Sequence, residues 1–262
     1  MSTAAANAPL WSARASDWAE LQEAQCAPMY EAVIDAVFDE PGRRLLDAGC
    51  GSGLAAALAR QRGFVVSGFD AAPGLLEVAR ERVPDADFRE GDLEQAPFDD
   101  HTFDAVIACN AVQYAANHGR AVRELARVAV PGGRIGIAMW AEHDRSEMSA
   151  VFDALGALMP PPPPGAPAPF ALERPGALEE LMNDAGISVD GGEDVPATFT
   201  YADLETAMRG QLSAGVLVRM EEAVGRERVH VTLSEVLERF QRSDGTVVFE
   251  NMFRYVVGRA PD

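Results

Sequence analysis

The sequence has no lysine, so every one of its 22 Lys+Arg residues is an arginine. This absence excludes Schiff-base catalysis by lysine and any phosphate-binding loop that needs a lysine. The three cysteines, Cys26, Cys50 and Cys109, show neither CxxC nor Cys/His spacing, which argues against a disulfide framework and a zinc site. No run of about 18 apolar residues predicts a transmembrane helix. The first residues lack the basic and apolar regions of a secretory signal, so we expect a cytoplasmic protein with reduced thiols.

Positive charge is scarce in this chain. Its 41 Asp+Glu residues against 22 Lys+Arg give a formal net charge of −19 and a pI near 4.5. Such a chain repels the phosphate backbone of nucleic acids and an anionic membrane surface, so we expect neither as a partner. The hydrophobic content of 48% and the charged content of 24% are typical of a globular protein. The length of 262 residues suits one or two domains.

Strands and helices are expected to alternate in the first half of the chain. Apolar runs predict strands at 44–48, 64–69, 86–89, 103–109 and 134–140. Helical spacing predicts two helices within 12–38, then helices at 54–60, 73–82 and 117–130. Asn117 is the expected N-cap of the last of these. The alternation predicts an α/β fold with a mostly parallel, Rossmann-like sheet.

The second half of the chain does not continue this alternation of strands and helices. Helices are predicted at 148–159, 175–185, 203–223 and 233–242, with strands beginning at 187 and 246. Five consecutive prolines, 160–164, predict a stiff polyproline II spacer. We expect a single domain over 1–262. Its parts are N-terminal lid helices (1–40), a cofactor-binding core (41–140), cap insertions (141–174 and 196–244) and a last strand (245–258).

The richest motif is LLDAGCGSGLAAALAR, in which a strand leads through glycines into a helix. Glycine allows a positive φ and a close approach of the backbone to a ligand, and such a loop places N–H groups at the carboxyl end of a strand. A dinucleotide fingerprint would need a glycine where Leu54 stands. Asp47 would also repel a pyrophosphate, whereas a sulfonium ligand that carries an ammonium group suits it. An NAD- or flavin-dependent oxidoreductase is therefore the less favoured reading of this loop.

Two further acidic residues follow neighbouring strands. Asp70, 19 residues after Gly51, can accept hydrogen bonds from both hydroxyls of a ribose. Asp92 can accept a hydrogen bond from the exocyclic amine of an adenine, while Leu93 packs on the face of the ring. Taken singly, Asp70 could cap the following helix and Asp92 could make a turn; together they indicate a nucleoside-containing cofactor.

Four stretches in this order resemble the class I S-adenosylmethionine-dependent methyltransferases: LLDAGCGSG, VVSGFDAAPGLLEVAR, FREGDLEQAPFDDHTFDAVIACNAVQY and RELARVAVPGGRIGIAMW. They cover roughly residues 40–140. Their sequences are most similar to the branch of ubiquinone/menaquinone C-methyltransferases and small-molecule methyltransferases of natural products. The resemblance implies a seven-stranded sheet whose last strand, VVFENMFRYVV, is antiparallel, with a helical cap over the acceptor pocket. It implies S-adenosylmethionine as cofactor and S-adenosylhomocysteine as product.

The resemblance also implies roles for individual residues. The methionine moiety of the cofactor would be surrounded by Asp47, Gly49, Cys50, Gly51 and Gly53. The ribose would be held by Asp70 and Ala71, the adenine by Asp92 and Leu93, and the sulfonium side by Asn110 and Gln113.

Methyl transfer needs mainly proximity, orientation and exclusion of water, and a base only if the acceptor must lose a proton. The candidate catalytic residues are His143 and Tyr114; the pKa of a histidine suits a base near neutral pH. The candidate residues for binding the acceptor are Trp18, Gln22, Tyr30, His118 and Trp140. The alternatives to these functional roles are structural: an ordinary loop histidine at 143, a capping role for His118 and core packing for the tryptophans.

The expected function is methylation of a small, hydrophobic metabolite at oxygen, carbon or nitrogen, in secondary metabolism. The expected partner is this small-molecule acceptor, and a homodimer stays open as an assembly. Two alternatives remain: a non-methylating protein that keeps the cofactor pocket, such as a repurposed cyclase or a binder, and the oxidoreductase mentioned above.

Overall fold

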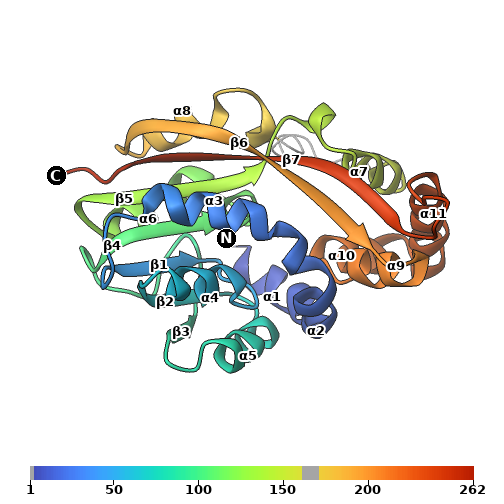
Figure 1. Ribbon diagram of the computed structural model, residues 1–262, viewed down its shortest axis with the longest axis horizontal. Helices are drawn as coiled ribbons and strands as arrows, with labels where there is room; N and C mark the ends of the chain where they lie inside the picture. Colours follow the sequence, from blue (N-terminus) through green and yellow to red (C-terminus); the bar gives the residue numbers. More distant parts are fainter. Residues whose placement is uncertain (1–2, 161–170) are drawn as a thin grey trace.

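The computed structural model describes residues 3–160 and 171–262. Its centre is a seven-stranded sheet with the order β3-β2-β1-β4-β5-β7-β6 (Figure 1). The strands are β1 (Arg44–Ala48), β2 (Val65–Asp70), β3 (Asp87–Glu90), β4 (Phe103–Cys109), β5 (Ala129–Trp140), β6 (Ser188–Tyr201) and β7 (Val247–Arg259). Strands β1 to β5 pair in parallel, and β7 is antiparallel to both β5 and β6. The prediction of a mostly parallel, Rossmann-like sheet is therefore confirmed, as is the antiparallel last strand.

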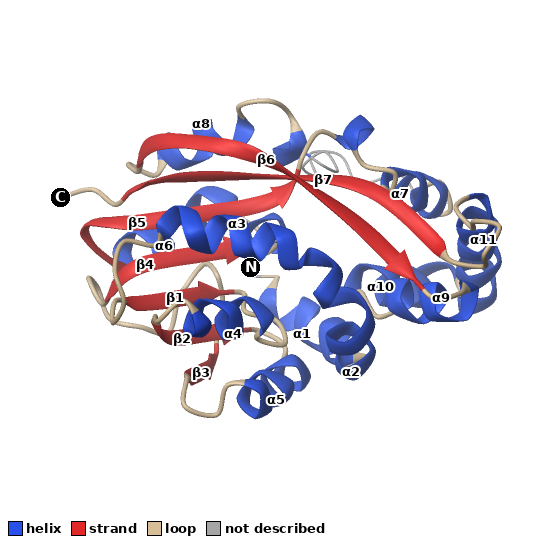
Figure 2. Ribbon diagram, in the orientation of Figure 1, coloured by secondary structure: helices blue, strands red, loops and turns tan. Residues whose placement is uncertain are grey.

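Helices cover both faces of the sheet (Figure 2). Successive side chains of a strand point to opposite faces, so Leu45 and Leu46 of β1 enter two different hydrophobic clusters. The cluster of Leu45 includes α3 (Ala27–Val37) and α4 (Leu54–Gln61), and α5 (Pro73–Arg82) packs next to them. The cluster of Leu46 includes α6 (His118–Val128) and α8 (Ala177–Asp184). The side chain of Asn117 accepts the N–H of Arg120, which confirms the predicted N-cap of α6.

Strands β6 and β7 run past the parallel strands to a group of cap helices (Figure 1). These helices are α7 (Ser149–Gly156), α9 (Leu204–Leu212), α10 (Gly215–Val224) and α11 (Arg226–Arg239). The expected cap insertion 196–244 begins too early, because residues 196–201 complete β6. The helix predicted over 203–223 is divided, since Ala214 has an extended backbone between α9 and α10. Apart from its first proline, the predicted polyproline spacer lies outside the described residues.

The N-terminal segment differs most from its prediction. It forms α1 (Ala4–Ser12), α2 (Ala15–Asp17), a π-helical turn η1 (Trp18–Gln22) and a 3-10 turn η2 (Glu23–Cys26) before α3. Residues far away in the sequence hold α1 in place: Asn7 donates to the backbone carbonyl of Tyr114 at 3.3 Å and accepts from Arg219 at 2.5 Å. Consequently α1 and α2 lie beside the carboxyl ends of the parallel strands (Figure 1). No helix in the described part of the chain has both the length and the apolar composition needed to cross a bilayer.

Candidate active site

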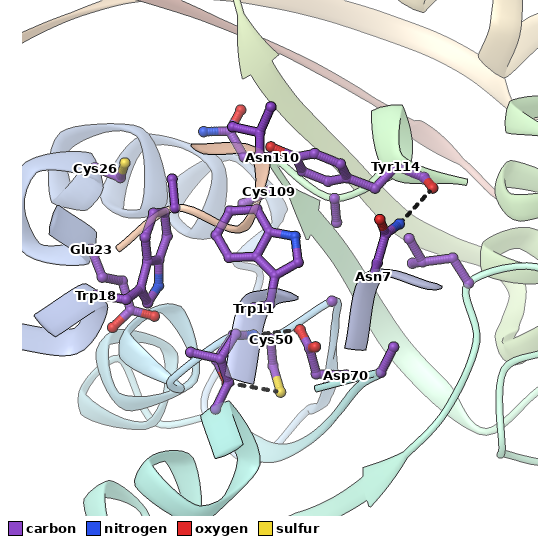
Figure 3. Close-up of a pocket in the computed structure, with 18 of the residues that line it drawn as sticks. Asn7, Trp11, Trp18, Glu23, Cys26, Cys50, Asp70, Cys109, Asn110 and Tyr114 are labelled. Carbon is purple, nitrogen blue, oxygen red and sulfur yellow. Dashed lines mark hydrogen bonds between the residues drawn. The ribbon is translucent and has the colours of Figure 1, made fainter. Parts of the chain in front are cut away.

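A pocket lies at the carboxyl ends of β1, β2 and β4, between the sheet, the N-terminal segment and the cap helices (Figure 3). Of the predicted cofactor residues, those that line it are Asp47, Gly49, Cys50, Gly51, Asp70, Ala71, Asp92, Leu93 and Asn110. Of the predicted acceptor and catalytic residues, those that line it are Trp18, Gln22, Tyr30, Trp140 and Tyr114. The structure therefore brings residues from both predicted groups to one cavity.

The glycine loop is shaped by its neighbours. Gly49 and Gly51 have φ values of +76° and +53°, which favour glycine. A Cβ on Gly49 would lie 2.5 Å from the Cβ of Ala111, so no side chain fits there. The N–H of Gly51 donates to Oδ2 of Asp70 at 2.9 Å, which ties the loop to the end of β2. Gly53 does not line the pocket; it lies against α5, where an added Cβ would be 2.9 Å from that of Ala79.

Asp47 is a buried carboxyl group with one unpaired oxygen. Its side chain is on β1, the residue is 1% exposed, and its Oδ2 atom has no hydrogen bond within the described structure. Burial, together with the charges of Glu23 and Asp70, raises the pKa of Asp47 to about 8. A buried carboxylate is costly unless a cation or donors pair with it. The unpaired oxygen of Asp47 thus suits a cationic group next to the glycine loop, such as the ammonium of S-adenosylmethionine.

Asp70 is held in a fixed orientation at the end of β2. Its Oδ1 accepts the N–H of Ala72 at 2.9 Å while its Oδ2 accepts that of Gly51. Burial raises the pKa of Asp70, and these backbone hydrogen bonds lower it. A carboxylate has about four acceptor positions, so two remain for the hydroxyls of a ribose. Asp92 makes a turn by accepting the N–H of Glu94 at 2.9 Å, and that turn presents Leu93 to the pocket.

The pocket is strongly acidic. Glu23, Asp47, Asp70 and Asp92 line it, and none of the described residues that line it is an arginine or a histidine. Glu23 already has partners within the protein, since it forms an ion pair with Arg82 and accepts from Ser52. The remaining carboxyl groups favour a cationic or neutral ligand over a phosphate or pyrophosphate.

The other half of the pocket is apolar and aromatic. Trp140 packs edge-on against Phe152 with ring centroids 6.0 Å apart, and Trp11 packs in the same manner against Trp18 at 4.9 Å and Tyr114 at 5.4 Å. Figure 3 shows the Trp11 indole between Trp18 and Tyr114. All three tryptophans and all three cysteines of the chain line this pocket.

The tyrosines and cysteines that line the pocket are held in their neutral forms. Burial raises the pKa of Cys26 and of Tyr114 to about 12, and raises those of Tyr30, Cys50 and Cys109 well above their usual ranges. None of these five groups is therefore a base at neutral pH.

His143, His118 and Gln113 do not line the pocket. The chain leaves the sheet after Trp140, and the His143 ring lies among cap residues, with Nε2 2.9 Å from Asp153 and Nδ1 3.6 Å from Glu173. His118 is the first residue of α6. Gln113 donates to Oδ1 of Asn110 at 3.5 Å, so it supports a pocket residue from behind.

Several lining residues were not predicted, among them Asn7, Trp11, Glu23, Met148 and Gln211. Asn7 and Trp11 belong to α1, whose sequence AAANAPLWS contains Pro9 and shows no amphipathic pattern. Met148 and Gln211 come from the cap and reach the pocket only through tertiary packing. No local signal in the sequence indicates these positions.

The comparisons with known proteins agree with this geometry. Residues 46–137 match the methyltransferase domain family. The chain is 34% identical over 197 residues to a malonyl-[acyl-carrier protein] O-methyltransferase of Erwinia pyrifoliae, which covers 75% of this chain and 70% of that protein. It is 37% identical over 106 residues to the demethylmenaquinone methyltransferase of Renibacterium salmoninarum, which covers 40% and 45%. The chain spans about half the length of this relative and of a Serratia marcescens malonyl-[acyl-carrier protein] O-methyltransferase.

Solved structures share the fold. The YcgJ protein of Bacillus subtilis has a TM-score of 0.60 at 20% identity over 89% of this chain and 98% of its own. The [4+2]-cyclase SpnF has a TM-score of 0.56 at 20% identity over 90% and 82%. Fold and relatives together define the class: a Rossmann-like methyltransferase domain. The chain belongs to the S-adenosylmethionine-dependent methyltransferases, and its cofactor is S-adenosylmethionine.

Proposed function

We propose that this chain transfers a methyl group from S-adenosylmethionine to a small, uncharged and mainly apolar acceptor. The observation that carries the proposal is the unpaired Oδ2 atom of the buried Asp47, beside an apolar half-pocket without cationic side chains among its described residues. Asp47 and the glycine loop would hold the methionine moiety, Asp70 with Ala71 the ribose, and Asp92 with Leu93 the adenine. The bound cofactor supplies an electrophilic methyl group on a sulfonium.

The lining of the pocket supports an uncharged acceptor. A malonyl group carries a carboxylate, and binding it would call for an arginine or another cation in the pocket. The described lining has four acidic side chains instead, and the chain has a net charge of −19. A demethylmenaquinone is neutral and apolar, and an acceptor of that general chemistry suits the wall formed by Trp140, Phe152 and Leu217.

The chain's own contribution to the reaction is orientation and exclusion of water. The tyrosines and cysteines that line the pocket keep their protons at neutral pH. An acceptor atom that is already nucleophilic, or that ionises readily, therefore needs no protein base here. The N-terminal segment and the cap would shield the transfer from water. Holding the acceptor close to the methyl group would accelerate the transfer.

Calorimetry with S-adenosylhomocysteine, S-adenosylmethionine and NADH tests the first half of the proposal. We expect the two adenosyl ligands to bind and NADH to show no binding. Incubation with methyl-labelled S-adenosylmethionine and neutral or anionic aromatic compounds tests the second half. Binding of NADH alone would overturn the proposal; cofactor binding without transfer to any compound would favour the alternative of a non-methylating binder or cyclase.

A further inference from the structure

A network of buried, uncharged polar side chains interrupts the apolar wall of the pocket. The hydroxyl of Tyr201 donates to Oε1 of Gln22 at 2.6 Å, and Nε2 of Gln211 donates to the same hydroxyl at 2.8 Å. Nε2 of Gln211 also lies 3.4 Å from Sδ of Met148. The three polar residues are 2–6% exposed and come from η1, the end of β6 and α9.

This network leaves one half of each carboxamide unused. The hydroxyl of Tyr201 occupies the oxygen of Gln22 and the nitrogen of Gln211. Nε2 of Gln22 and Oε1 of Gln211 have no hydrogen bond within the described residues, although both side chains line the pocket. Neither atom is among the polar atoms that are sealed from solvent without a partner. A donor and an acceptor are therefore available to a ligand at the same wall.

The pattern does not depend on how the two amides are oriented. If both amides rotate by 180°, the hydroxyl of Tyr201 accepts from Gln22 and donates to Gln211. The oxygen of Gln22 and the nitrogen of Gln211 are then the groups left for a ligand, which again makes one acceptor and one donor. Buried polar networks are costly unless their groups are satisfied, so a bound molecule with a donor and an acceptor completes this one.

We propose that Gln22 and Gln211 bind the polar end of the acceptor and that Tyr201 positions both amides. The chemical class that fits is a neutral molecule with a hydroxyl and a carbonyl group on an apolar frame. An ionised group is disfavoured because no charged side chain belongs to the network. This inference rests on the proposed function, since it concerns the acceptor half of the same site.

The test uses the full chain saturated with S-adenosylhomocysteine and three hydroxyketones of increasing size. These are 4-hydroxyacetophenone, 6-hydroxy-1-tetralone and 7-hydroxyflavone, each compared with the same ketone without the hydroxyl, and with benzoate as the anion. We expect at least one hydroxyketone to bind about tenfold more tightly than its match, the ratio expected for one buried hydrogen bond. The near-isosteric changes Gln22→Met and Gln211→Met, and Tyr201→Phe, should abolish that ratio.

Two further readouts separate ligand binding from a structural role. The affinity for S-adenosylhomocysteine should stay unchanged in these variants, because none of the three residues is proposed to contact the cofactor. Gln25→Met is the matched control: Gln25 also ties the N-terminal segment to β6, through the backbone of Thr200, but does not line the pocket. We expect Gln25→Met to keep the tenfold ratio.

Four outcomes would overturn the inference. These are a ratio that survives in Gln22→Met and Gln211→Met, a ratio that Gln25→Met also abolishes, tighter binding of benzoate than of any hydroxyketone, and no hydroxyketone binding at all. In each case bound S-adenosylhomocysteine would leave the proposed cofactor function intact. Failure of the chain to bind S-adenosylhomocysteine would instead refute the proposed function itself.

Discussion

Asp47 on β1 and Asp70 at the end of β2 are carboxyl groups that share one pocket, and the charge of Asp70 acts on Asp47. Burial is the main reason that the pKa of Asp47 rises to about 8, and the charges of Glu23 and Asp70 add to the rise. Asp70 is stabilised by two backbone N–H donors, whereas one oxygen of Asp47 has no partner in the described structure. The two groups are therefore expected to respond differently to pH and to the cofactor.

Cofactor binding should release a proton from Asp47. Below a pH of about 8 this carboxyl group is mostly protonated in the unliganded chain. An ammonium group beside it favours the carboxylate, so S-adenosylhomocysteine should displace about one proton near pH 7, and affinity should rise with pH up to about 8. Calorimetry in two buffers of different ionisation enthalpy measures this number. Asp47→Asn should bind more weakly and release none; proton uptake by the wild type would contradict the assignment.

The same shift predicts how the unliganded fold responds to pH. The folded pKa of Asp47, about 8, lies above the value of 3.8 for an unperturbed group. The unfolded chain loses this proton near pH 4 and the folded chain only near pH 8, so the contribution of this group to stability is lost as pH rises between these values. We expect Asp47→Asn to flatten the fall of the thermal midpoint over this interval. An unchanged slope in Asp47→Asn would show that other groups dominate.

Asp70→Ala should weaken cofactor binding. The change removes two charge-assisted hydrogen bonds to the ribose, which are worth about 1.5–3 kcal/mol each, so we expect a loss of about 3–6 kcal/mol in affinity. It also frees the N–H groups of Gly51 and Ala72, which would add mobility to the glycine loop. Asp85→Ala is the control, because Asp85 is an exposed acid paired with Arg60. Equal affinities of the two variants for S-adenosylhomocysteine would refute the ribose assignment.

The core of the fold could be predicted because its signals are local. The strand of Leu45 and Leu46, its glycine loop and the following helix form one continuous pattern, and the structure keeps the strand's predicted bounds. Strand β6 was predicted only at its start, because Gly191, Gly192 and Pro196 interrupt the apolar alternation. That strand is held by its long antiparallel pairing with β7, which no local pattern reports.

The candidate site follows the same division. Residues at strand ends, such as Asp70 and Asn110, could be predicted because parallel strands bring their carboxyl ends to one edge of the sheet. Trp11 could not, since its helix α1 has no clear pattern, and Gln211 could not, since only long-range packing brings α9 to the pocket. His143 follows β5 closely in the sequence, but the chain turns into the cap after Trp140, and the ring pairs with Asp153 there.

His143→Ala should leave methyl transfer nearly unchanged. The structure places this ring outside the pocket lining, next to Asp153 and Glu173. Loss of a general base would lower turnover about 10²-fold or more, whereas loss of these cap contacts should lower only the thermal midpoint. Single-turnover rates and thermal melts of the variant measure the two effects. A rate about 10²-fold lower, with cofactor affinity intact, would restore His143 as the catalytic base.

The ion pair between Glu23 and Arg82 should hold the N-terminal segment over the cofactor. Glu23 is 2% exposed, and Arg82 also donates to the carbonyl of Ser52 at 2.8 Å, so one cluster joins η2, the glycine loop and α5. Arg82→Met would leave a buried carboxylate without its cation, which costs about 3–5 kcal/mol when both partners are buried and less here, because Arg82 is partly exposed. We expect a lower thermal midpoint and faster dissociation of S-adenosylhomocysteine, followed by tryptophan fluorescence, since all three tryptophans line the pocket.

Arg60→Met is the matched control, because its pair with Asp85 is exposed on both sides and should contribute at most about 1 kcal/mol. If dissociation from Arg82→Met were no faster than from Arg60→Met, the cluster would serve the fold without controlling access to the cofactor.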